Sequence, residues 1–169
     1  MKAPTGGFNS KVDEIAAAFE GPMATVIAEG KQLENPTAKK LTVLVPITGT
    51  DVSQRAAEIA FSLGTDATIT AFYVGQKSSA KAPSRQDRSQ ARTILKDIAE
   101  MASRYSVKIE TRSVFGSGAA DAILAEAKTG GHDLIMMGVS RHSGEKLYFG
   151  DTPAAVLAKS PCSLLFLAT

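Results

Sequence analysis

Short apolar runs alternate with longer amphipathic segments from about residue 41 to the end of the chain. The runs have the length and the β-branched or aromatic content of strands, and they lie at 41–47, 68–74, 107–114, 133–137 and 163–168. Apolar residues recur on one helical face in the segments 52–63, 88–105, 119–128 and 153–159. Because strands that alternate with helices need crossover connections, the pattern predicts an α/β fold: an open, doubly wound, five-stranded parallel sheet with helices on both faces.

The first 39 residues do not follow this alternation. Residues 1–8 contain a proline and two glycines and are expected to form a loose arm. Ser10 can cap a short helix with an apolar stripe, and the apolar run 23–28 is expected to form a strand. The segment 29–40 has the Gly, Asn, Pro and Lys content of a linker. We therefore divide the chain into an N-terminal region, residues 1–39, with an extra helix and strand, and a main domain, residues 40–169.

The composition favours one domain with a sizeable core, since 44% of the 169 residues are hydrophobic. The formal net charge is only +2, and basic and acidic residues are interspersed, so we expect no nucleic-acid partner. Cys162 is the single cysteine, and no secretory signal pattern opens the sequence. No apolar run approaches the roughly 20 residues of a membrane-spanning helix. We therefore expect a cytoplasmic location.

In open parallel sheets a ligand binds beyond the carboxyl ends of the strands, where the strand order reverses. The loops expected at that edge are 46–51, 115–118 and 138–152. The third is the most informative, because three glycines punctuate it and it ends at the start of a helix. Glycines let backbone N–H groups approach a phosphate, and the helix dipole favours an anion there. The sequence therefore predicts a pocket for an anionic ligand at this loop.

The residues around this loop resemble the C-terminal half of a universal stress protein. The resemblance rests on the segment Asp133-Leu-Ile-Met-Met-Gly138, on the following Gly144 and Gly150, and on Ser160-Pro161-Cys162. The opening Leu41-Thr-Val-Leu-Val-Pro-Ile-Thr-Gly-Thr50 is similar to the first strand and loop of that family. The resemblance implies an adenine nucleotide alpha hydrolase-like fold, a role in the stress response, and a homodimer joined through the last strand, Ser163 to Ala168.

ATP-binding members of that family carry a loop of the form G-x2-G-x9-G-[S/T]. In this chain Arg141 takes the place of the second glycine, the last interval is one residue shorter, and Asp151 stands where the hydroxyl residue is expected. Thr48 replaces the acidic residue that follows the family's first strand. The resemblance nevertheless implies a set of pocket residues, which are Pro46, Ile47, Thr48, Val74, Met137, Gly138, Arg141, Gly144, Gly150, Asp151 and Thr152.

These departures leave two main hypotheses for function. The first is a regulatory, ligand-sensing domain that binds an adenine nucleotide, ATP or AMP, or a related anionic ligand. The second is a nucleotide-free dimerisation module with a degenerate loop, which the departures at Thr48, Arg141 and Asp151 favour. The carboxylate of Asp151 would repel a phosphate, whereas Arg141 could supply a counter-charge. A weak nucleotide hydrolase ranks below both, because no residue is recognisable as a base or as a group that positions water.

A second resemblance concerns the residues before the main domain. The segment 19–30, together with 45–53, is similar to the juncture that precedes stress-protein domains fused to bacterial cation/proton antiporters. This resemblance implies that the chain is the cytosolic part of a transporter, that it lies at the cytosolic face of the inner membrane, and that it regulates ion transport. It also explains the extra helix and strand.

The sequence indicates neither an enzyme nor a metal site. The nucleophile motif G-x-S-x-G is missing, and Asp121 falls where Gly116 and Gly118 would need a third glycine for a dinucleotide fingerprint. His132 and His142 have no partners at metal-ligand spacing. We therefore expect a binding protein that catalyses no reaction and holds no metal ion.

The last expected strand, 163–168, is strongly apolar and lies at an edge of the predicted sheet. An exposed apolar edge invites pairing, so we expect it to be covered. A second copy of the chain is one candidate, as the family resemblance implies. The N-terminal strand 23–28 is the other, either from the same chain or by exchange between two chains.

Overall fold

The computed structural model describes residues 8, 10–18, 21–29, 40–76, 82–116, 118–140 and 149–168. The helices and strands follow in the order α1 (Ser10–Ala17), β1 (Met23–Ile27), β2 (Leu41–Ile47), α3 (Asp51–Phe61), β3 (Ala67–Gly75), α4 (Arg85–Arg104), β4 (Ile109–Phe115), α5 (Ala119–Thr129), β5 (Leu134–Val139), α6 (Asp151–Lys159) and β6 (Ser163–Ala168). A short 3₁₀ turn, Gly64–Asp66, joins α3 to β3.

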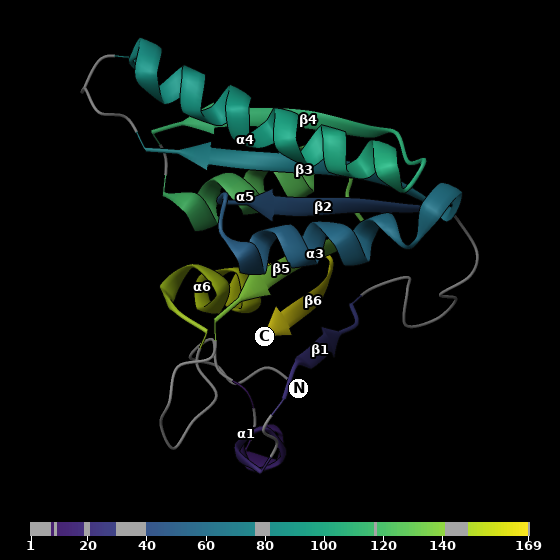
Figure 1. The fold of residues 1–169 in the computed structure, drawn as a ribbon. Coiled ribbons are helices and arrows are strands. Elements are labelled where there is room, and N and C mark those ends of the chain that lie inside the picture. Colours follow the sequence, from purple (N-terminus) through teal and green to yellow (C-terminus); the bar gives the residue numbers. More distant parts are fainter. Residues whose placement is uncertain are drawn as a thin grey trace.

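The strands form one six-stranded sheet in the order β1-β6-β5-β2-β3-β4 (Figure 1). Strands β2 to β6 are parallel to one another, and β1 runs antiparallel against β6. Helices α3 and α4 cover one face, and α5 and α6 cover the other. The predicted doubly wound α/β fold, with its extra N-terminal helix and strand, is therefore confirmed.

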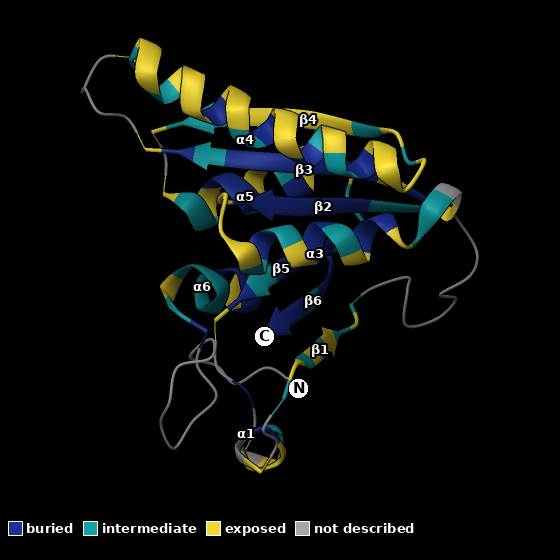
Figure 2. Ribbon diagram, viewed as in Figure 1, coloured by how far each residue is buried: buried dark blue, intermediate teal, exposed yellow. Residues whose placement is uncertain are grey.

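Side chains from β2 divide between two apolar cores, one on each face of the sheet. Val43 and Val45 pack beneath α3 and α4, whereas Leu44 packs beneath α5 and α6, and all three are fully buried. In a strand buried on both faces, apolar residues do not alternate with polar ones. This explains the unbroken apolar run in the sequence. Figure 2 shows that the central strands are buried, whereas the outer strand β4 is largely exposed.

Strand β1 covers the edge of β6 from within the same chain. Its register runs from Met23 opposite Ala168 to Ile27 opposite Leu164, and the Glu29 N–H donates to the Ser163 hydroxyl (N···Oγ 3.0 Å). Of the two covers expected for this edge, the N-terminal strand of the same chain is the one present. A homodimer joined through Ser163–Ala168 would therefore have to displace β1.

Helix α4 begins three residues earlier than the apolar pattern suggested. The Asp87 N–H donates to the Ser84 hydroxyl (3.0 Å), and the Ser84 N–H donates to the Asp87 carboxylate (2.7 Å). This reciprocal capping box fixes the start of the helix at Arg85. Within the described part of the chain, no helix is both long enough and apolar enough to span a membrane.

Candidate functional site

The strand order reverses between β2 and β5, which is where doubly wound sheets open a ligand crevice. From β2 the chain crosses outward to β3 and β4, and then returns to β5 on the other side of β2. Connections that leave in opposite directions cannot both cover the strand ends, so we expect a crevice beyond the carboxyl ends of these two strands. The residues at its mouth are those that follow β2 and those that begin α6.

A buried hydroxyl group fixes the loop that follows β2. Ser53 is only 2% exposed. Its hydroxyl accepts a hydrogen bond from the Thr48 N–H (3.3 Å) and donates one to the Thr50 carbonyl (2.8 Å). Gly49 between them has a φ of +82°, a conformation that favours glycine. These hydrogen bonds give the loop a defined shape, and the hydroxyls of Thr48 and Thr50 lie together on its exposed side, 2.9 Å apart.

Gly138 permits a close contact between β5 and the first turn of α3. A Cβ atom at this position would overlap the carbonyl of Val52 and would lie 2.9 Å from the Ser53 nitrogen. The predicted importance of Gly138 therefore has a packing reason: helix backbone already fills the space next to it. A bulky substitution here would push α3 away from the sheet instead of filling the crevice.

The remaining described candidates separate into core residues and rim residues. Pro46, Ile47 and Met137 are buried in β2 and β5, and Val74 of β3 is half-buried. Ile47 packs on the α3 side of the sheet, whereas Met137 and Val74 pack on the opposite side. They support the crevice from below and do not share one lining surface. The rim is formed by Thr48, Gly150, Asp151 and Thr152, and Arg141 and Gly144 lie outside the described residues.

Three of the helices that start at this edge of the sheet lack a side-chain cap. These are α3 after Thr50, α5 after Gly118 and α6 after Gly150, in contrast to the capped α4. The first N–H groups of an α-helix have no partner within the helix, and they carry partial positive charge. Gly150, with a φ of +96°, leads the chain directly into α6. The crevice therefore presents backbone donors of the kind that bind anions.

Sequence reasoning missed Ser53 and Gly49 as parts of this site. The sequence does contain a signal for Gly49, because a glycine directly after a buried strand and before a helix often has a positive φ. No comparable signal marks Ser53, whose hydroxyl becomes a loop anchor only when the helix turns it back toward β2. Among the described residues, no group of three His, Cys, Asp or Glu side chains could hold a metal ion.

The sequence profile of the universal stress protein family matches residues 41–167, which is most of the chain. This chain belongs to the universal stress protein family. The matched part begins at β2, so α1 and β1 lie outside it although β1 is a strand of the same sheet. No curated protein sequence matches the chain.

Solved structures of universal stress proteins have the same fold. The protein UspA from Lactobacillus plantarum is 20% identical with a TM-score of 0.62, and the match covers 77% of this chain and 99% of that one. A universal stress protein in complex with cAMP is 22% identical (TM-score 0.60; 75% and 95% covered). A family member from Arabidopsis thaliana with AMP bound is 20% identical (TM-score 0.56; 76% and 91% covered). At these identities the likeness establishes the fold alone.

Proposed function

We propose that this protein is a regulatory domain that binds an adenine nucleotide, or a related anionic ligand, in the crevice between β2 and β5. The observation that carries the proposal is the pair of uncapped helix N-termini, α3 and α6, at the two sides of the crevice, beside the exposed hydroxyls of Thr48 and Thr50. Backbone N–H groups bind phosphate oxygens, and hydroxyl groups bind ribose or phosphate.

Two of the similar structures are nucleotide complexes, and they support a ligand with one phosphate group. Their ligands are cAMP and AMP. The departures of this chain from the family's ATP loop include the carboxylate of Asp151, which is exposed in the first turn of α6. Repulsion by that carboxylate grows with the charge of the ligand, so we expect AMP to bind more tightly than ATP.

The proposed role is binding rather than catalysis. The hydroxyl of Ser53, which is the buried polar group closest to the loop after β2, is already engaged in two hydrogen bonds that shape the loop. A hydroxyl held in this way stabilises the loop and is poorly placed to act as a nucleophile. A partner protein would instead distinguish the occupied crevice from the empty one. We propose a cation/proton antiporter as this partner.

The N-terminal segment supplies a physical route for that signal. Phe8 is buried against Phe149, and Phe149 directly precedes Gly150 at the start of α6. A ligand that moves the start of α6 would therefore alter the packing of Phe8. Such a ligand shifts the equilibrium between two arrangements only by its difference in affinity for them.

Isothermal titration calorimetry with AMP, cAMP and ATP tests the proposal. Thr48→Trp places a large side chain on the exposed rim of the crevice, and Thr68→Trp is the matched control, because Thr68 is exposed at the opposite end of the sheet. We expect AMP to bind the native protein and the control equally, and to bind Thr48→Trp about tenfold or more weakly. Equal binding to both variants would place the site elsewhere.

The alternative function, a nucleotide-free dimerisation module, is favoured by the position of Asp151. It predicts no heat with any of the three nucleotides, together with a stable dimer in sedimentation velocity experiments. The covered edge of β6 argues against the dimer contact that the family resemblance implied. A monomer that binds AMP supports the proposed function, and a dimer that binds none of the nucleotides supports the alternative.

A further inference from the structure

The strand β4 forms the outer edge of the sheet, opposite the edge covered by β1. No other described strand pairs with its outer side. Its central residues, 110–113, are exposed, in contrast to the buried strand β3 beside it. An edge strand of this kind offers a row of backbone hydrogen-bonding groups to another chain.

The hydrogen bond from the Gly116 N–H to the Gly75 carbonyl (3.1 Å) shows which groups face outward. It places the Gly116 N–H toward β3, and the carbonyl of Phe115, on the other side of the same peptide unit, away from β3. Because N–H and C=O directions alternate along a strand, Thr111, Ser113 and Phe115 direct their backbone groups to the open side. These three residues direct their side chains toward α4.

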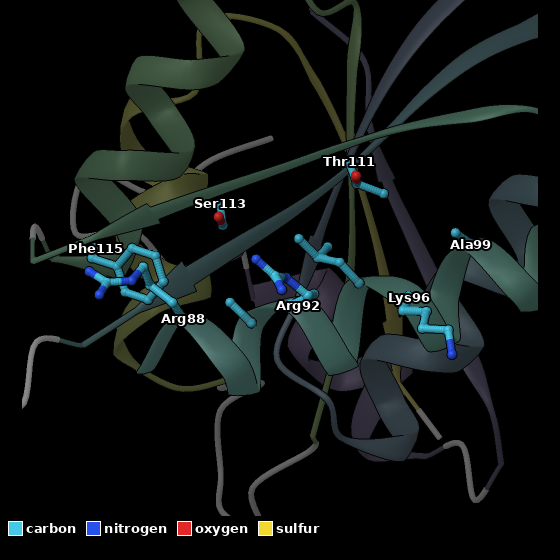
Figure 3. Close-up of a pocket in the computed structure, with 9 residues that line it drawn as sticks. Arg88, Arg92, Lys96, Ala99, Thr111, Ser113 and Phe115 are labelled. Atoms are coloured by element: carbon cyan, nitrogen blue, oxygen red, sulfur yellow. The ribbon is translucent and has the colours of Figure 1, made fainter. Parts of the chain in front are cut away.

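A groove of about 460 Å³ lies between α4 and β4. Leu95 of α4 and Phe115 of β4 are among its apolar residues, and Thr111 and Ser113 add hydroxyl groups. Figure 3 shows Thr111 and Ser113 of β4 on one side of the groove, and the cations Arg88, Arg92 and Lys96 of α4 along the other. The groove is thus a strand edge with an adjacent row of positive charge.

Little in the described structure neutralises this row of cations. Arg92 has no ion-pair partner among the described residues, and Arg88 donates to the carbonyl of Pro83 (2.7 Å). Lys96 pairs with Glu100 on the exposed surface of the helix (3.3 Å), an interaction that an incoming carboxylate can exchange at little cost. The charged side chains of β4 itself lie on the opposite face of the sheet, where Arg112 pairs with Glu126 of α5 (2.9 Å).

We propose that this groove binds an extended acidic peptide as an added strand on β4, with its carboxylates paired to Arg88, Arg92 and Lys96. The peptide backbone would take up the outward N–H and C=O groups, and alternate side chains would reach the cations. A second copy of this chain fits the edge less well. In antiparallel pairing, the two-fold axis is perpendicular to the sheet and would place the α4 helices of both copies on the same face, with their cation rows side by side.

Fluorescence anisotropy with the full chain tests the proposal. The probe is a fluorescein-labelled peptide in which Glu and Val alternate, and the comparison peptide has Lys in place of Glu. We expect saturable binding of the acidic peptide only, weakened about tenfold or more between about 50 and about 500 mM NaCl. Two further acidic peptides carry N-methyl groups on alternate peptide bonds, one on the odd-numbered bonds and the other on the even-numbered bonds. In one of them methylation removes the N–H groups that face β4, and we expect this peptide not to bind.

Two protein variants separate charge from backbone recognition. The double variant Arg88→Glu/Arg92→Glu should bind the acidic peptide at least about tenfold more weakly. The control Arg85→Glu/Arg104→Glu makes the same change in net charge at exposed ends of α4 outside the groove, and should bind within about twofold of the native chain. Ser113→Pro removes an outward N–H from an edge strand and should also weaken binding.

The proposal is overturned if both charge-reversed variants bind equally, or if the N-methylated peptides bind as well as the parent. It is also overturned if sedimentation velocity shows a dimer of the native chain that Ser113→Pro dissociates, because the edge would then belong to a second copy. Circular dichroism of each variant checks that the fold is retained. The double charge variant changes only exposed side chains, so it keeps the test decisive if Ser113→Pro fails to fold.

Discussion

Phe8 packs edge-on against Phe149, with ring centroids 5.8 Å apart and an angle of 75° between the rings. Phe149 makes a second contact of this kind with Phe166 of β6 (5.6 Å), which also meets Phe8 (6.5 Å). Three aromatic rings distant in sequence thus share one core. The consequence is that a residue outside the part matched by the family profile helps to hold the start of α6 in place.

Phe8→Ala should therefore destabilise the whole domain. Burial of a phenylalanine in a core accounts for about 3 kcal/mol of the free energy of unfolding, and Phe8 is only 9% exposed. Urea denaturation followed by circular dichroism measures the change. The control is Ile15→Ala in α1, where the native side chain is 69% exposed and the loss should be close to zero. Equal effects of the two substitutions would show that Phe8 is not part of the core in solution.

Gly138→Ala tests the close approach of β5 to α3. The added methyl group overlaps the Val52 carbonyl, which belongs to the helix backbone and cannot move without shifting α3. We expect a loss of about 2 kcal/mol or more in the free energy of unfolding. Gly118→Ala is the matched control, because a Cβ there meets only the Asp121 carboxylate at an ordinary distance of 3.5 Å. A neutral result for Gly138→Ala would mean that the gap between β5 and α3 is wider than the structure shows.

The main strands and helices could be predicted from the sequence because their burial determines the spacing of apolar residues. A strand such as β2, buried on both faces, has to be apolar throughout, and an amphipathic helix has to repeat every three or four residues. The sequence did not show which of two candidates covers β6, because edge pairing depends on tertiary distance and not on local pattern. It also grouped Ile47 with Met137 as pocket residues, although they lie on opposite faces of the sheet.

Asp133 and Thr42 join the beginnings of β5 and β2, at the end of the sheet opposite the crevice. The Asp133 carboxylate accepts hydrogen bonds from the Thr42 N–H (3.1 Å) and from the Thr42 hydroxyl (2.7 Å). Hydrogen bonds to a charged group contribute about 1.5–3 kcal/mol, so Asp133→Ala should lower the free energy of unfolding by about 2 kcal/mol.

A double-mutant cycle with Thr42→Val isolates the hydrogen bond between the Thr42 hydroxyl and Asp133, because valine keeps the backbone N–H but lacks the hydroxyl. If the two residues act through each other, the combined variant loses clearly less stability than the sum of the single losses. Asp66→Ala, a change at an exposed position in the turn before β3, is the control for loss of one negative charge. Strict additivity of Asp133→Ala and Thr42→Val would show that the hydroxyl hydrogen bond contributes nothing measurable.

Removal of β1 should expose the edge of β6 and change the oligomeric state. A chain that begins at residue 40 retains the five parallel strands, but it leaves the apolar strand Ser163–Ala168 without its antiparallel partner. An unprotected edge of this kind pairs with another copy, so we expect a dimer in sedimentation velocity experiments where the full chain is a monomer. A peptide of residues 21–29, added in excess, should restore the monomer, and a scrambled peptide should not. A shortened chain that stays monomeric would show that the β6 edge does not self-associate even when β1 is absent.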